Sequence, residues 1–125
     1  MNTKSGKAKG RRLQNWVRDR LYDTFKFTEE DIRVAIMGES GEDIKLISSS
    51  AKAKFPYSIE IKNKEAHNVW ADYAQASANA PESREPILII KRNKHKPLAV
   101  IDATVLIEQL HYCTYWTNGG AASKE

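Results

Sequence analysis

The sequence predicts an α/β domain in which helices flank a mixed β-sheet, with elements in the order α, α, β, β, α, β, β, α. Apolar residues recur at helical spacing near the amino terminus, isoleucines alternate with charged residues between positions 43 and 62, and two unbroken apolar runs follow at 86–90 and 97–101. The 125 residues suffice for one domain that buries roughly two-thirds of the surface exposed by the unfolded chain.

A first helix is predicted from Arg11 to about Phe25. Its apolar stripe, which follows the 3.6-residue periodicity of a helix, consists of Leu13, Trp16, Val17 and Leu21. Residues 1–9 precede this helix and are expected to form a flexible basic arm, because glycines flank their lysines. Thr28, with acidic residues close behind it, is typical of a helix N-cap, so a short second helix is predicted to about Ala35.

Two strands are predicted next, at 43–47 and 58–62, and the residues between them at 48–54 fit either a loop or a helical turn. Side chains of a strand alternate between its two faces, so the charged and apolar residues separate. The apolar set is Ile44, Leu46, Ile59 and Ile61, and the charged set is Asp43, Lys45, Glu60 and Lys62.

A third helix is predicted at 66–80, followed by strands at 86–90 and 97–101. The basic turn between these strands favours an antiparallel pair. Because both strands are unbroken apolar runs, we expect them to be covered on both faces. A last helix is predicted from Val105 to His111, and a flexible tail at 117–125.

Basic residues are clustered more strongly than the net charge of +4 indicates. Seven lie between Lys4 and Arg20 with a single acid among them, and a second cluster fills positions 91–96. Such clusters neutralise phosphates and favour salt-dependent binding of nucleic acid, although a solvated tail and a solubilising turn are the alternative. The single Cys113 excludes an internal disulfide and indicates a reducing cytosol, and we expect neither a signal peptide nor a membrane span.

The charged face of the two central strands predicts a specific chemistry. If the isoleucines build the core, two carboxylates (Asp43 and Glu60) and the ammonium of Lys62 converge on one polar edge. Two carboxylates in contact repel by about 1 kcal/mol in water and about 4 kcal/mol at an intermediate dielectric, which favours a divalent cation between them. Carboxylate oxygens with open water positions suit Mg²⁺, so the pattern indicates a metal-dependent phosphodiesterase.

Asp43, sixteen intervening residues, Glu60-Ile61-Lys62 and a following helix with Gln75-Ala76 together resemble the PD-(D/E)XK nuclease superfamily. Within it, residues 9–110 are most similar to small Holliday-junction-resolvase-like and Mrr-like endonucleases, including some phage-encoded ones. The resemblance implies a restriction-endonuclease-like core and a single nuclease-like domain at 10–116. It also implies a cytoplasmic protein of a microbial or phage-infected host cell.

The roles of the family can be transferred to the matching positions. The resemblance implies that Asp43 and Glu60 hold Mg²⁺, or Mn²⁺ in its place, together with the backbone carbonyl of Ile61. Lys62 would position or help to deprotonate the attacking water and offset charge on the phosphate. Gln75 would orient groups from the third helix. The implied activity is hydrolysis of DNA phosphodiester bonds, leaving a 5′-phosphate, with DNA recognised by its shape or branching.

The residues expected to contact DNA come mostly from the arm and the first helix, and they are Lys7, Lys9, Arg11, Arg12, Gln14, Arg18 and Lys94. Gln14 occupies a position where such resolvases often carry a metal-binding glutamate, and Glu39 or Glu42 could supply the missing carboxylate. Gln14 favours the alternative of a catalytically inactive nucleic-acid-binding module on the same fold; a third alternative is a protein whose basic arm binds an acidic partner. Cutting both strands would require a symmetric homodimer, with Trp116 and the segment 112–115 as a candidate apolar seam.

Overall fold

The computed structural model describes residues 3–117, and within this range the chain forms four helices and five strands. In chain order they are α1 (Thr3–Phe25), β1 (Ile32–Val34), β2 (Ile44–Leu46), α2 (Ser49–Lys54), β3 (Tyr57–Asn63), α3 (Val69–Asn79), β4 (Glu85–Lys91), β5 (Leu98–Val100) and α4 (Ala103–Thr117). The α/β class is therefore confirmed. None of the helices in this range is long and apolar enough to cross a bilayer.

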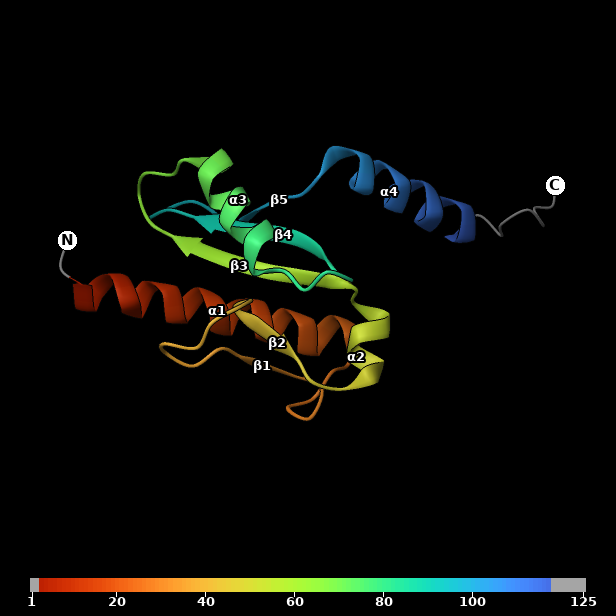
Figure 1. Ribbon diagram of the computed structural model, residues 1–125, viewed down its shortest axis with the longest axis horizontal. Coiled ribbons are helices and arrows are strands. Elements are labelled where there is room, and N and C mark those ends of the chain that lie inside the picture. The colour runs from red at the N-terminus through yellow and green to blue at the C-terminus, as the bar shows by residue number, and fades with distance from the viewer. Residues whose placement is uncertain (1–2, 118–125) are drawn as a thin grey trace.

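The strands form two small sheets. Strand β3 pairs in parallel with β4, and β4 pairs antiparallel with β5, so the larger sheet is mixed. The antiparallel arrangement predicted for the last two strands is confirmed. Strands β1 and β2 form a separate antiparallel pair. Helices α1 and α3 both contact β3, and they lie on opposite sides of it (Figure 1).

The hydrophobic core lies between α1 and the strands. Leu13, Val17 and Leu21 of α1 pack with Ile59 and Ile61 of β3, as the helical stripe predicts. The placement of Trp16 in the same stripe is wrong, because this side chain is 47% exposed. The cluster also includes buried residues of the β1–β2 hairpin and the segments around it: Phe27, Ile32, Ile44, Leu46, Ala51 and Phe55. Full burial of one such side chain stabilises a fold by about 1.5–3 kcal/mol. This core therefore fixes both sheets against one helix.

The prediction of a second helix after Thr28 is wrong. Thr28 does close a turn, because its amide donates to the Asp31 carboxylate at 2.9 Å and its hydroxyl accepts from the Glu30 amide at 3.2 Å. The chain then extends into β1, because burying the β-branched Ile32 against β2 outweighs the local helical signal. The observed order is α, β, β, α, β, α, β, β, α.

Helix α1 begins at Thr3, eight residues before the predicted start, and so includes most of the segment predicted to be a flexible arm. Gly6 and Gly10 each cost about 1 kcal/mol within a helix. The side chain of Lys9 anchors this part of the helix, because it is buried and donates to Glu65 at 3.2 Å. The Lys9 carbonyl also accepts a hydrogen bond from the Asn63 side chain at 3.0 Å, which ties this part of α1 to the end of β3.

The carboxy-terminal elements also differ from expectation. Of the two apolar strands, β4 is half-buried and β5 leaves Leu98 and Ala99 exposed, so the prediction of cover on both faces is wrong. Helix α4 is longer than predicted and extends away from the sheet (Figure 1). The predicted tail lies, after Thr117, outside the described residues, as does the side chain of Trp116 in the candidate dimer seam.

Candidate functional site

Strand β3 brings one acidic and one basic side chain to the face opposite the core. Ile59 and Ile61 point toward α1, and Glu60 and Lys62 therefore point toward the side covered by α3. Glu60 is buried, and its side chain is only 6% exposed. Burying a charged carboxylate raises the free energy of the folded state unless the carboxylate is paired, so the partners of Glu60 define the chemistry of the site.

Asp43 joins Glu60 from a different sheet. It directly precedes β2, and its amide donates to the Ile59 carbonyl at 2.9 Å. One oxygen of its carboxylate accepts a hydrogen bond from the Ile61 amide at 2.7 Å. Asp43 is therefore held at the edge of β3 that no strand of the larger sheet covers, beside Glu60.

One hollow of about 430 Å³ collects the residues that the sequence singled out for catalysis. Its lining includes all four of them, together with Ile61, whose backbone carbonyl was expected to bind the metal: Asp43, Glu60, Ile61, Lys62 and Gln75. The remainder comes from α1, the 39–41 turn and the end of α3, namely Gly10, Gln14, Glu39, Ser40, Gly41 and Asn79. Segments that are distant in sequence thus meet at one polar surface.

One ion pair and one hydrogen bond hold the Glu60 carboxylate. The Lys62 ammonium lies 3.6 Å from one oxygen, and the side-chain amide of Asn79 donates to the other at 3.0 Å. Sequence reasoning missed Asn79, although its position four residues after Gln75 puts both on one helix face. A positive charge and an amide donor thereby orient Glu60 without removing its capacity to bind a cation.

The Asp43 carboxyl has the pKa expected of a desolvated acid with an acidic neighbour. Burial is the main cause that raises its pKa from 3.8 to about 6, and the negative charge of Glu60 raises it further, against the hydrogen bond from the Ile61 amide. A divalent cation would relieve both effects. The donor set of two carboxylates and a backbone carbonyl is one that Mg²⁺ accepts, so these residues fit the implied metal.

Neither Glu39 nor Glu42 offers the hollow a third unpaired carboxylate. Glu39 lines it but is engaged by the Arg33 guanidinium at 3.0 and 2.8 Å, and this hydrogen bonding is the main cause that lowers its pKa to about 2. Glu42 is buried against Arg84 at 2.8 Å. Gln14 does line the hollow, as an amide. Within residues 3–117 there is no cluster of three or more acidic, histidine or cysteine side chains suited to a metal.

A second hollow of about 490 Å³ adjoins the first and shares Gly10, Gln14, Glu39 and Asp43 with it. Lys7 and Arg11 line this hollow from α1, so these two predicted DNA contacts lie beside the carboxylates. Their sequence spacing of four residues puts them on the same helix face. The two hollows together form one groove between α1 and the β1–β2 hairpin, with a polar end at Asp43 and Glu60 and a more apolar end at Ile36 and Met37.

The other predicted DNA contacts lie elsewhere. Arg12 lines a separate hollow beside Trp16. Arg18 pairs with Asp19 at 2.9 Å, and Lys94 is exposed in the turn between β4 and β5. Lys9 is only 6% exposed and bound to Glu65, so it serves the fold and does not present its charge to DNA.

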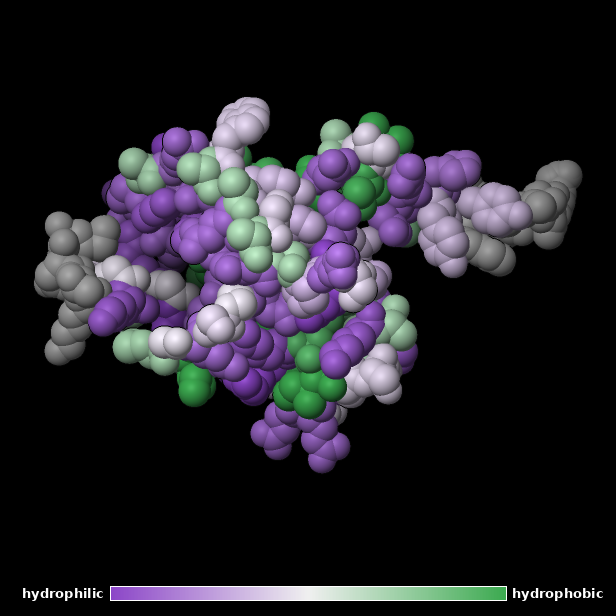
Figure 2. Space-filling model, in the orientation of Figure 1, coloured by the Kyte–Doolittle hydropathy of each residue, from purple (hydrophilic) through white to green (hydrophobic). Residues whose placement is uncertain are grey.

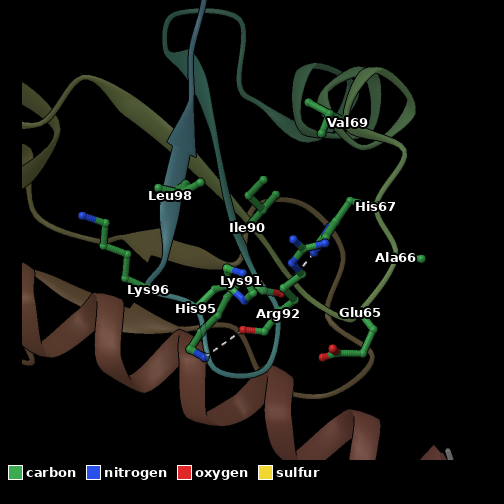
Figure 3. Close-up of a pocket in the computed structure, with 10 residues that line it drawn as sticks. All are labelled: Glu65, Ala66, His67, Val69, Ile90, Lys91, Arg92, His95, Lys96 and Leu98. Atoms are coloured by element: carbon green, nitrogen blue, oxygen red, sulfur yellow. Dashed lines mark hydrogen bonds between the residues drawn. The ribbon is translucent and has the colours of Figure 1, made fainter.

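A hollow of about 520 Å³ opens on the far flank of α3, between its first residue, the end of β4 and β5 (Figure 3). His67 lines it and lies 3.1 Å from the Lys91 carbonyl through Nε2. Behind His67, the buried Asp72 accepts a hydrogen bond from Lys64 at 3.2 Å. None of the four catalytic candidates lines this hollow.

Comparisons with protein-family models, with curated proteins and with solved structures return no match. The functional assignment therefore depends on the geometry of the groove. Its distinguishing property is that the carboxylates of Asp43 and Glu60, the ammonium of Lys62 and three side-chain amides face one hollow. These groups come from α1, α3, β3 and the residue that precedes β2.

Proposed function

We propose that this protein is a Mg²⁺-dependent endonuclease that hydrolyses phosphodiester bonds in DNA. The observation that carries the proposal is the common hollow of Asp43, Glu60 and Lys62 at the open edge of β3. The buried Glu60 and the raised pKa of Asp43 are the electrostatic features expected of carboxylates that hold a cation.

Each residue of the hollow has a distinct role in this proposal. Asp43, Glu60 and the Ile61 carbonyl would hold Mg²⁺, which when bound polarises the phosphate and lowers the pKa of a coordinated water. The Lys62 ammonium would face the negative charge that builds on the phosphate, because it is already fixed beside Glu60. Gln75, which reaches the hollow from α3, would orient the attacking water.

The basic side chains beside the hollow suggest how DNA is held. Lys7 and Arg11 would bind backbone phosphates next to the scissile bond, which contributes affinity without reading sequence. DNA would then be selected by shape or branching, as in Holliday-junction-resolvase-like enzymes of a restriction-endonuclease-like fold. Cutting both strands of a junction would use a symmetric homodimer.

Cleavage of labelled DNA by the purified protein tests the proposal. We expect linear or four-way-junction DNA to be cut in Mg²⁺ and to remain intact in EDTA, and products to carry 5′-phosphates. Lys62→Ala should lower the cleavage rate by about 100-fold or more while leaving DNA affinity nearly unchanged. Lys52→Ala, which changes an exposed lysine of α2 outside the hollow, is the matched control. Equal cutting by Lys62→Ala and the unsubstituted protein would refute the assignment.

A catalytically inactive DNA-binding module is the second candidate, and one observation favours it. Gln14 brings an uncharged amide to the hollow where related nucleases often have an acid, and Glu39 is engaged by Arg33. Titration calorimetry with Mn²⁺ or Ca²⁺ separates the candidates. Heat of binding that disappears in Asp43→Asn supports the nuclease, whereas DNA binding without any metal binding at millimolar concentrations supports the module.

A further inference from the structure

The turn between β1 and β2 exposes two large apolar side chains next to the candidate site. Ile36 is 69% exposed and Met37 is 67% exposed, which makes them two of the most exposed large hydrophobic residues among those described. They are adjacent in sequence at the tip of the hairpin, and together with Gly38 we call them the 36–38 tip. A small hydrophobic patch is visible at the lower left of the molecule in Figure 2, where Figure 1 places the turn between β1 and β2.

The 36–38 tip is held rigidly. The Ile36 amide donates to the Glu39 carboxylate at 3.0 Å, and the Glu39 amide donates to the Ile36 carbonyl at 3.0 Å. Arg33 fixes the same carboxylate through two hydrogen bonds. Gly38 has a φ of +84°, which a residue with a Cβ rarely adopts. The backbone of the tip is therefore ordered before any binding, which lowers the conformational-entropy cost of presenting these two side chains to a partner.

The surroundings of the tip match a nucleic acid. Ile36 and Met37 line the same hollow as the cationic Lys7 and Arg11. The tip starts directly opposite a candidate metal ligand, because the Ala35 amide donates to the Asp43 carbonyl at 2.8 Å. The turn runs beside the amino-terminal half of α1, which carries both basic side chains (Figure 1). Positive charge for phosphates and an apolar projection for bases thus occur side by side.

We propose that Ile36 and Met37 form a wedge that inserts between bases at a branch point of DNA and directs the adjacent strand to Asp43 and Glu60. This inference rests on the proposed function and names the feature that would make the enzyme selective for branched substrates. Apolar side chains of this kind partly unstack base steps when they insert. Insertion is easiest where stacking is already interrupted, so the wedge favours junctions over linear duplex.

Fluorescence of 2-aminopurine placed beside the branch of a four-way junction tests the wedge. The full chain is mixed with this DNA in EDTA, so that binding is measured without cleavage. We expect emission to rise as the base unstacks. In the double variant Ile36→Ser, Met37→Ser the rise should be lost, and the preference for junction over linear duplex should fall about tenfold. Ile47→Ser, which changes an exposed apolar residue just after β2, is the control and should behave like the unsubstituted protein.

The outcomes separate the wedge from the proposed function. A double variant that keeps both the emission change and the junction preference refutes the wedge, while Mg²⁺-dependent cleavage by the same protein would still support the nuclease. Absence of any DNA binding by the unsubstituted protein refutes both. Because the tip is exposed, the double variant should keep its helical circular dichroism and melting temperature, which excludes loss of fold as the cause.

Discussion

The carboxylate of Asp43 accepts a 2.7 Å hydrogen bond from the backbone amide of Ile61, the residue that follows Glu60 on β3. The two candidate metal ligands come from different sheets, so no strand pairing fixes their separation. Their separation is fixed instead by this hydrogen bond and by the one that the Asp43 amide donates to the Ile59 carbonyl. The Ile61 amide is thereby satisfied at the edge of the sheet, and the site is built into the backbone of β3.

The raised pKa of Asp43 predicts a pH-dependent cost in the metal-free protein. Its pKa is about 6 in the folded chain and 3.8 in an ordinary environment, mainly because of burial. The folded state therefore resists ionisation of Asp43, so the free energy of unfolding falls as the pH rises. This loss of stability is absent below about pH 4 and reaches its full value above about pH 6. In EDTA at pH 8, the free energy of unfolding of Asp43→Asn should exceed that of the unsubstituted protein by about 1–2 kcal/mol, after allowance for partial solvent screening. At pH 3 the two proteins should be equally stable.

Urea unfolding at the two pH values measures this difference. The Asn oxygen can still accept the hydrogen bond from the Ile61 amide, so the substitution changes the charge more than the packing. A variant that is less stable at pH 8 than the unsubstituted protein would show that the carboxylate is not strained by burial.

Asn79 is predicted to act as a positioning residue for Glu60, because its side-chain amide donates to Glu60 at 3.0 Å. Asn79→Ala should raise the Mg²⁺ concentration needed for half-maximal cleavage by about tenfold, as is typical when a partner of a metal ligand is removed. Asn68→Ala removes the N-cap of the same helix without touching Glu60 and is the matched control. Equal Mg²⁺ dependence in the two variants would leave Asn79 without this role.

Much of the site could be predicted because it depends on strand alternation. Once Ile59 and Ile61 are assigned to the core, Glu60 and Lys62 must share the other face, and the structure agrees. Helix α3, the antiparallel β4–β5 pair and the apolar stripe of α1 follow from equally local patterns. These features need no knowledge of distant contacts.

The remaining features depend on contacts between distant residues, which a single sequence does not encode locally. Thr28 has a helix-capping signature, but Ile32 is drawn into β1 by pairing with Leu46. Lys9 resembles the other exposed lysines of the amino terminus, but Glu65 lies 56 positions away in sequence and buries it. Arg84 is likewise buried by a distant partner, because it pairs with Glu42, which lies 42 positions earlier in the sequence.

The buried ion pair between Arg84 and Glu42 predicts a large asymmetry in stability. The two side chains are 10% and 7% exposed, and their charged atoms lie 2.8 Å apart. Arg84→Met should destabilise the fold by about 3–5 kcal/mol, because it leaves a buried carboxylate without its cation. The double variant Glu42→Leu, Arg84→Met should recover most of this loss. Chemical denaturation of the three proteins measures both values, and a single variant as stable as the original would contradict the pairing.

The basic residues at the start of α1 are predicted to have two different roles. Lys7 and Arg11 are expected to bind DNA, whereas Lys9 is expected to stabilise the fold. Lys7 and Arg11 line the groove, so the double variant Lys7→Ala, Arg11→Ala should weaken DNA binding and reduce the slope of log affinity against log salt by about 2, one for each lost phosphate contact. Lys52→Ala, Lys54→Ala removes the same charge from α2, which lies beside the other end of α1 (Figure 1), and should leave the slope unchanged.

Lys9→Ala should instead lower the melting temperature and leave the salt slope unchanged, because the Lys9 ammonium is buried against Glu65. Titration of labelled duplex DNA at several salt concentrations, together with thermal unfolding, distinguishes the two effects. If Lys9→Ala reduced the slope as strongly as the groove variant, DNA would have to reach a side chain that the fold covers. The proposed path of DNA along the Lys7–Arg11 face of α1 would then be wrong. Lys9 is two residues from both Lys7 and Arg11, so its side chain projects from a different face of the helix and one phosphate cannot contact both faces.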